Sequence, residues 1–295
     1  MSTIVRPAWQ GKPKPVALAL KAVAVVLALA LVLFPFLIVF STSVSDSESI
    51  TKAGGFVVWP DSFTLDAYTQ VFEGGVVTRA VVVSTLVTLV GTAISLTTTV
   101  LAAYALSRRG ALFQRPLLTF VLVTFLFTPG MIPLYLAVKE LGLLDSYWAL
   151  VLPTAFSVFN MIVVRGFMMG IPQELIDSAK IDGAGEFRIL WNISLPLSRA
   201  VIAVVGMFYA VSYWNAFFNA LIYLNDSTKW PLQLVLRTYV LQGSALVDSG
   251  GDQAAPPAQS VQMAVVLIAI VPILLAYPLV QRHLTKGVLT GAVKG

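Results

Sequence analysis

The sequence predicts an all-α fold, a polytopic membrane bundle of six transmembrane helices, on three observations. Hydrophobic residues make up 58% of the chain and charged residues 11%, whereas soluble domains usually have about 25% charged residues. The apolar residues are gathered in six blocks, each reaching the length of about 20 residues that a helix needs to cross a bilayer. The blocks leave no room for the turns between strands, and a helix satisfies its own backbone hydrogen bonds in lipid.

The blocks define the expected spans, which are residues 16–40, 76–106, 117–138, 148–169, 197–224 and 261–280. The first block is long, lacks a small-residue cleavage site and is followed by five more spans, so we interpret it as an anchor and not as a signal peptide. Residues 1–15 are then a cytoplasmic N-terminal tail, and residues 16–295 form one transmembrane domain. In the third span, Pro129, Gly130 and Pro133 favour a kink, with a gate hinge as the alternative.

The distribution of Lys and Arg predicts that both termini lie in the cytoplasm. In that orientation, 14 Lys and Arg residues fall in cytoplasmic segments and 5 in external ones, which is the bias that membrane insertion follows. Two external segments are long, about 41–75 and 225–260, and a cytoplasmic segment of about 171–196 joins spans four and five. The turn-rich external stretch 242–259 is interpreted either as a slack connector or as a contact with an external partner.

Composition also excludes several classes of function. The chain has no Cys and one His, His283, so it lacks the residues for a disulfide, a Cys-metal site, a His-clustered metal centre or a Ser-His-Asp triad. The net charge of +5 does not indicate nucleic-acid binding, because most of the basic residues lie in the segments between apolar blocks. We therefore expect neither an enzyme nor a nucleic-acid partner.

The cytoplasmic segment 171–196 has the pattern of a helical hairpin. Pro172 suits the first turn of a helix, and Glu174 and Asp177 lie near that start, where the helix dipole favours acids. Gly183 permits a sharp turn or a left-handed conformation. Helical spacing predicts a short apolar face on the first helix, made of Leu175, Ile176, Ala179 and Ile181.

A second helix of this hairpin is expected over residues 184–192, with Phe187, Leu190 and Trp191 on one side. Pro196 then marks the return of the chain to the membrane. These features predict two short helices that meet at a glycine on the cytoplasmic face. From the residues alone, an interfacial amphipathic hairpin without any partner is an alternative.

This segment resembles the EAA loop of ABC importer permeases, whose pattern is Glu-Ala-Ala, then Gly, then Ile-x-Leu-Pro. The corresponding residues are Asp177-Ser178-Ala179, Gly183 and Ile193-Ser194-Leu195-Pro196. The resemblance covers about residues 127–242 and resumes in the tail 291–295. It is closest to the carbohydrate-importing, MalG-like branch and its LplC/YtcP-like group, through the runs 129–136, 141–150 and 213–215.

The resemblance implies a type I, MetI-like permease fold in a bacterial cytoplasmic membrane. It implies a permease subunit that forms half of the translocation pathway of an ATP-dependent, binding-protein-dependent sugar or oligosaccharide importer. The implied partners are a second homologous permease, two ABC ATPase subunits, an extracytoplasmic solute-binding protein and the lipid bilayer. The chain has no Gly-x-x-x-x-Gly-Lys-Ser/Thr phosphate loop, so ATP and Mg are expected on the ATPase subunits and no cofactor is expected in this chain.

In this family the EAA loop is the coupling helix that sits in a cleft of the ATPase subunit. The resemblance therefore implies an ATPase-coupling role for Glu174, Asp177, Ser178, Ala179, Asp182, Gly183 and Ala184. Small residues allow close approach to the ATPase subunit, and acids pair with its basic residues. Gly183 sets the angle between the two helices, and its alternative role is that of a helix C-cap. Asp177 and Ser178 replace the Glu and Ala of the family pattern, so we expect docking with an altered ion-pair geometry.

Sugars are held by aromatic faces and neutral polar groups, and spans four and five supply both. The residues expected along a translocation path are Asn160, Tyr209, Tyr213, Trp214, Asn215 and Asn219. Ordinary packing between helices is the alternative for each of them.

An ion-coupled secondary transporter is the alternative function. Such carriers usually place Asp, Glu or His at membrane depth. Every acid of this chain and His283 lie outside the six apolar blocks, which argues against proton coupling.

Overall fold

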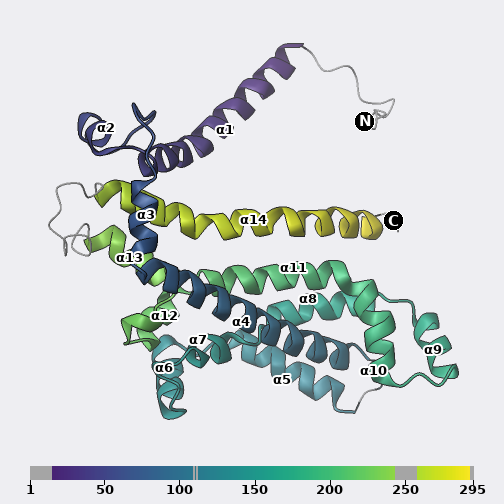
Figure 1. Cartoon of the computed structure of the whole chain (residues 1–295). Coiled ribbons are helices and arrows are strands. Elements are labelled where there is room, and N and C mark those ends of the chain that lie inside the picture. The colour runs from purple at the N-terminus through teal and green to yellow at the C-terminus, as the bar shows by residue number, and fades with distance from the viewer. Residues whose placement is uncertain (1–14, 109, 111, 243–257, 293–295) are drawn as a thin grey trace. The chain divides into compact units, whose positions relative to one another are not determined.

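The computed structural model describes residues 15–108, 110, 112–242 and 258–292. These residues are helical apart from connecting turns and one isolated β-bridge between Ser45 and Phe63, which confirms the all-α fold (Figure 1). The elements in chain order are α1 (Pro15–Ser43), α2 (Ser47–Lys52), α3 (Asp66–Glu73), α4 (Val76–Ser107), α5 (Gln114–Leu126), α6 (Met131–Glu140), α7 (Trp148–Val151), η1 (Leu152–Thr154), α8 (Val158–Met169), α9 (Gln173–Ile181), α10 (Glu186–Ile189), η2 (Leu190–Ser194), α11 (Leu195–Trp214), α12 (Phe217–Tyr223), η3 (Ser227–Lys229), α13 (Leu232–Gln242) and α14 (Ala258–Ala292).

The chain divides into two compact units, residues 1–69 with 251–264 and residues 70–250 with 265–295. In the first unit, the apolar side chains of α1 are exposed along most of the helix, as suits a helix that faces lipid. Its last turn is polar and buried, because the following segment folds back over it. Ser41 Oγ donates to the Val58 carbonyl at 2.8 Å, and Thr42 Oγ1 accepts from the Val57 N–H at 3.0 Å.

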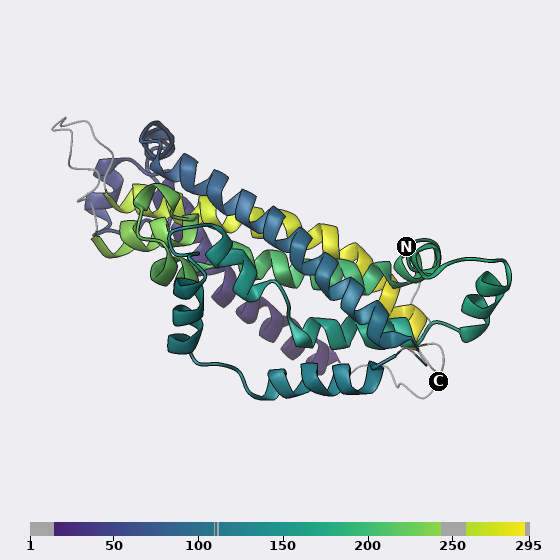
Figure 2. The ribbon, with the colours of Figure 1, turned by 90° about the horizontal axis from the view of Figure 1, so that it is seen from below.

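In the second unit, α4, α8 and α11 pack against one another and supply most of the core, and Figure 2 shows them side by side as in Figure 1. α11 packs closely on α4 at Gly91, where a Cβ atom would come within 2.8 Å of the Tyr213 ring. Within this unit, α9 and α10 lie at one end of the bundle, and α6, α12 and α13 lie at the opposite end (Figure 1).

Among the described residues, four helical stretches are long and apolar enough to cross a membrane, over Pro15–Ser43, Val76–Ser107, Glu186–Trp214 and Gln259–Ala276. Two bent pairs of helices bring the number to six if each pair is one span, in agreement with the six spans expected. The expected bend at Pro129, Gly130 and Pro133 lies within the first of these pairs, whereas the bend within the fourth span, residues 148–169, was not expected. α5 and α6 meet at 116°, and α7 with η1 meets α8 at 51°.

The first break has a local cause in the sequence, whereas the second is held by residues that lie far away along the chain. Pro129 has no N–H and disfavours helix in the residue before it, so α5 ends before the break, which is far sharper than the expected kink. In the other break, the Ala155 carbonyl accepts from Thr98 Oγ1 at 3.0 Å, and the Ser157 N–H donates to the Tyr209 hydroxyl at 3.0 Å. Irregular backbone at membrane depth requires such partners.

The fifth span also differs from its expected bounds of 197–224. α10, η2 and α11 form one helical stretch from Glu186 to Trp214, so the expected second hairpin helix is the start of the span and not a separate element. Pro196 occupies the first turn of α11, where its missing N–H costs little. The stretch ends at Asn215, before α12. The expected tail 1–15, apart from Pro15, and most of the turn-rich stretch 242–259 lie outside the described residues.

Candidate functional site

The hairpin formed by α9 and α10 turns at Gly183. The backbone of Gly183 is left-handed, with φ of +77°. Its N–H donates to the Lys180 carbonyl at 3.0 Å, and the Ala184 N–H donates to the Ala179 carbonyl at 2.9 Å. This pair of bonds is the Schellman arrangement that ends a helix at a glycine. A Cβ atom at Gly183 would meet no atom within 4 Å, so glycine is favoured here by its backbone conformation and not by crowding within the chain.

The residues expected to couple to an ATPase lie on the accessible side of this hairpin. Glu174, Asp177, Ser178, Asp182 and Gly183 are exposed, and Ala179 and Ala184 are half-buried. Gln173 Nε2 donates to Asp177 Oδ1 at 2.9 Å, and Ser178 Oγ donates to the Glu174 carbonyl at 2.8 Å. The carboxylates of Glu174, Asp177 and Asp182 and the Ser178 side chain are thus accessible on the hairpin.

The apolar side chains of the hairpin divide into two sets. Ile176 and Leu190 are buried against the bundle. Ile181 and Phe187 are 86% and 83% exposed, and Trp191 is 73% exposed. The expected grouping of Leu190 with Phe187 and Trp191 on one side is therefore wrong, because Leu190 turns inward where α10 enters the bundle.

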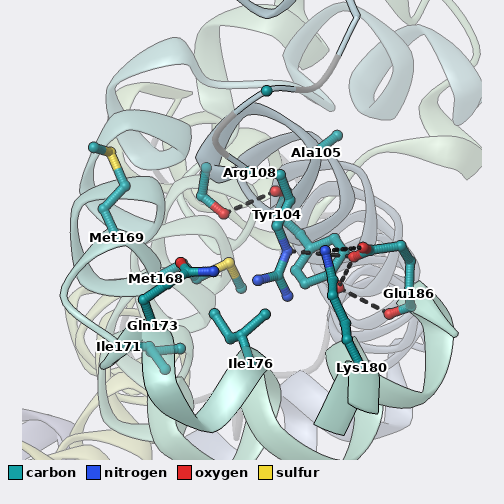
Figure 3. Close-up of a pocket in the computed structure, with 12 residues that line it drawn as sticks. Tyr104, Ala105, Arg108, Met168, Met169, Ile171, Gln173, Ile176, Lys180 and Glu186 are labelled. Atoms are coloured by element: carbon teal, nitrogen blue, oxygen red, sulfur yellow. Dashed lines mark hydrogen bonds and ion pairs between the residues drawn. The ribbon is translucent and has the colours of Figure 1, made fainter. Parts of the chain in front are cut away.

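Behind the hairpin lies a side-chain cluster that the sequence did not reveal, made of Tyr104, Arg108, Lys180 and Glu186 (Figure 3). The Tyr104 hydroxyl lies 2.7 Å from Glu186 Oε2 and 2.8 Å from the Glu186 carbonyl. Glu186 also pairs with Arg108 Nε at 3.4 Å and with Lys180 Nζ at 3.2 Å. The Arg108 guanidinium lies 4.1 Å from the centre of the Tyr104 ring. In the sequence, Arg108 and Lys180 count only among the basic residues that predict the membrane orientation.

The cluster borders a cavity of about 560 Å³ between α4, α8 and α9. Its wall is half apolar, with Met168, Met169, Ile171 and Ile176, and half polar, with the cluster and Gln173. Two further bonds hold the end of α4 beside it. The Leu106 carbonyl accepts from Arg165 Nε at 2.9 Å and from Gln114 Nε2 at 2.8 Å.

The residues expected along a translocation path do not share one environment. Tyr209, Tyr213, Trp214 and Asn160 are buried within the chain. The Tyr209 and Tyr213 hydroxyls bond to Thr99 Oγ1 at 2.6 Å and Ser95 Oγ at 2.7 Å, and Trp214 Nε1 donates to the Ala269 carbonyl at 3.0 Å.

The two other candidates lie nearer the surface. Asn215 is exposed and Asn219 is half-buried. Asn215 Nδ2 donates to the Val211 carbonyl at 2.9 Å.

The described residues contain no group of three or more His, Asp or Glu side chains placed to hold a metal ion.

Comparison with known proteins identifies the family of this chain. Residues 95–290 match the family described as "Binding-protein-dependent transport system inner membrane component". The chain is 47% identical to the polygalacturonan/rhamnogalacturonan transport system permease protein YtcP of Bacillus subtilis over 81% of this chain and 85% of that protein. It is 49% identical to the protein LplC of Bacillus subtilis over 81% of this chain and 82% of that protein.

A solved structure supports the same assignment. It is a bacterial ABC transporter involved in the import of the acidic polysaccharide alginate, and one chain of it matches with a TM-score of 0.84 and 26% identity over 94% of this chain and 99% of that chain. These matches confirm the resemblance, the fold and the expectation of a transporter subunit. The chain therefore belongs to the family of binding-protein-dependent transport system inner membrane components, the permease subunits of ABC importers.

Proposed function

We propose that this permease imports carbohydrates, with oligosaccharides as the substrate class. The observation that carries the proposal is 47% identity over 81% of the chain with a permease named for polygalacturonan and rhamnogalacturonan transport. The transporter with the similar fold imports alginate, an acidic polysaccharide. Acidic oligosaccharides are therefore the first class to test.

The proposed assembly contains this chain, a second homologous permease, two ABC ATPase subunits and an extracytoplasmic solute-binding protein. A structural neighbour with a TM-score of 0.56 was solved with a periplasmic protein that carries an alginate pentasaccharide. This neighbour supports the fold, and by analogy the proposed solute-binding partner of this chain is an oligosaccharide-carrying protein outside the membrane. ATP and Mg bind to the ATPase subunits. The N- and C-termini face the cytoplasm, because 14 of the 19 Lys and Arg residues then lie inside, as membrane insertion favours.

In this assembly the hairpin couples ATP hydrolysis to transport. Ser178 and Ala179 allow close approach to the ATPase subunit, while Glu174, Asp177 and Asp182 supply accessible carboxylates for its basic residues. Ala184 follows Gly183, which fixes the hairpin turn. Closure of the ATPase dimer moves the hairpin, and the two positions of the hairpin correspond to two states of the bundle.

Among the residues proposed for the translocation path, Asn215 and Asn219 have the accessibility that contact with a passing sugar requires. Tyr209 and Tyr213 use their hydroxyls to hold α11 against α4 and the break before α8. Together with Trp214 and Asn160, which are also buried, they support the helices that line the path and do not contact the sugar directly.

The experiment is uptake into proteoliposomes that hold the importer purified with its partner subunits. Labelled oligogalacturonides, arabino-oligosaccharides and lactose are supplied with the cognate binding protein, and uptake is measured with and without internal ATP. We expect ATP-dependent uptake of an oligosaccharide. Uptake by the permease alone, driven by an ion gradient without any ATPase subunit, would contradict the proposal.

A further inference from the structure

Two of the three helices at the core of the second unit are continuous with the hairpin. α8 leads into α9 through residues 170–172, and α10 runs through η2 into α11. The third core helix, α4, is separated from the hairpin in sequence by α5 to α8. Any movement of the hairpin reaches α8 and α11 along the chain, but it reaches α4 only through side chains.

We propose that Glu186, Tyr104, Arg108 and Lys180 form a clamp that fixes the hairpin to the cytoplasmic end of α4, so that α4 moves with it. This inference rests on the proposed coupling function of the hairpin. The four residues are positioning residues, since they act through the helices that they join.

The geometry of the clamp supports this role. Lys180 precedes the turn at Gly183 and Glu186 follows it, so their ion pair of 3.2 Å holds the two arms of the hairpin together. The same carboxylate reaches Tyr104 on α4, at 2.7 Å, and Arg108, the residue that follows α4, at 3.4 Å. One side chain therefore fixes both the angle of the hairpin and its distance from α4.

The two residues at the end of α4 are held more firmly than those on the hairpin. Tyr104 is buried, and the Arg108 side chain is 16% exposed and stacks on the Tyr104 ring. The side chains of Lys180 and Glu186 are 50% and 52% exposed. Exposed ion pairs add little to stability, so these contacts matter for where the hairpin lies more than for whether the bundle folds.

A second tie runs from α8 to the same end of α4. Arg165 Nε donates to the Leu106 carbonyl at 2.9 Å. This bond joins α8 to α4 without involving the hairpin arms, so it supports α4 but does not report hairpin movement directly. Loss of the Glu186 clamp is accordingly expected to weaken coupling without abolishing it.

The test compares Glu186→Gln, Tyr104→Phe and the control Glu48→Gln in the purified importer. Glu48 forms an ion pair of 2.8 Å with Lys52 in the first unit, so the control loses an exposed ion pair that involves no residue of the hairpin. The measurements are copurification of the ATPase subunits, ATP hydrolysis and sugar uptake. For Glu186→Gln and Tyr104→Phe we expect wild-type copurification and continued hydrolysis, but a fall of about fivefold or more in sugar taken up per ATP, the usual range of coupling between sites.

A covalent substitute separates clamping from a general effect on structure. The double variant Arg108→Cys, Glu186→Cys carries the only two Cys residues of this chain, because the chain itself contains no Cys. A short bis-methanethiosulfonate reagent can therefore bridge these two positions and no others within the chain. We expect low uptake per ATP before the reaction, recovery after bridging and loss again after reduction.

The outcomes also separate this inference from the proposed function. Unchanged uptake per ATP in both single variants, failure of the ATPase subunits to copurify with them, or no recovery on bridging would overturn the clamp. A Gly183→Asp arm tests the function of the hairpin itself. If that variant transports normally, the coupling role of the hairpin fails whatever the clamp variants do.

Discussion

The second unit contains the same glycine turn at both of its ends. α9 ends at Gly183 and α6 ends near Gly142, with φ of +77° and +66°. The Gly142 N–H donates to the Lys139 carbonyl at 2.9 Å, and the Leu143 N–H donates to the Val138 carbonyl at 3.1 Å, which repeats the Schellman bonding at Gly183. An acid follows three residues later in both, Glu186 in one and Asp145 in the other.

The two acids bind different kinds of partner. Asp145 Oδ1 accepts from the backbone N–H groups of Asn225 and Asp226, at 3.1 and 3.0 Å, and Oδ2 pairs with Lys229 at 2.9 Å. Asp145 thus fixes one loop to another, and Lys229 holds the pKa of its carboxyl below the usual value. Glu186 instead joins side chains of α4 and α9.

From this difference we infer that one type of glycine turn serves a structural role at Gly142 and the proposed coupling role at Gly183. The turn at Gly142 lies at the end of the unit opposite the hairpin, where Asp145 binds the loop of residues 225–229. The turn at Gly183 carries the accessible acids and small residues of the EAA-like motif, and its tie reaches a helix that spans the bundle. Matched changes at the two turns can therefore separate folding from coupling.

The largest expected effect is a contrast between Gly183→Asp and Gly142→Asp. Both sites are left-handed, and a Cβ atom at either meets nothing within 4 Å, so the backbone cost of the substitution is similar, about 1–2 kcal/mol. We expect both variants to insert in the membrane, while Gly183→Asp reduces ATP-dependent uptake to background and Gly142→Asp retains most of it. Equal uptake in the two variants, measured at equal membrane abundance, would remove the functional distinction between the turns.

A smaller effect is expected from Gly91→Ala, which tests the helix that joins the two ends. The new methyl would lie 2.8 Å from the Tyr213 ring, and that ring is held by bonds from its hydroxyl to Ser95 and Val151. Overpacking of this kind costs about 1–3 kcal/mol, so the midpoint of thermal unfolding should fall. Gly166→Ala is the control, because a Cβ atom there meets nothing within 4 Å. A midpoint unchanged by Gly91→Ala would show that α4 and α11 can separate at little cost.

The smallest effect is expected from Asp145→Asn, which keeps an acceptor oxygen but removes the charge opposite Lys229. The pKa of Asp145 is lowered from its usual 3.8 and that of Lys229 is raised from its usual 10.5. The stabilisation is therefore complete at neutral pH, and it is lost as pH falls through the lowered pKa of Asp145 or rises through the raised pKa of Lys229. Thermal midpoints of wild type and variant should differ by a constant small amount from pH 5 to 9 and converge only outside 3.8 to 10.5. Convergence at pH 6 would assign the effect to another group.

Much of this arrangement could be predicted from the sequence, because block length and residue type are local properties. The six apolar blocks, the helix before Gly183 and the left-handed glycine follow from composition and spacing. The breaks before α6 and α8 did not follow fully, since the second depends on Thr98 and Tyr209, which lie far away in the sequence. The Glu186 cluster was missed for the same reason. Tyr104 and Glu186 are 82 positions apart, and no spacing rule relates them.

The proposed contact between the hairpin and an ATPase subunit can be tested by site-specific photocrosslinking in the assembled importer. Phe187 is 83% exposed, so p-benzoylphenylalanine can replace it with little change in shape, and Trp59, which is 75% exposed in the first unit, serves as the control position. In the assembled importer, we expect irradiation to join position 187 to the ATPase subunit and position 59 to other partners. An intact importer in which position 187 never crosslinks to the ATPase subunit would contradict the account.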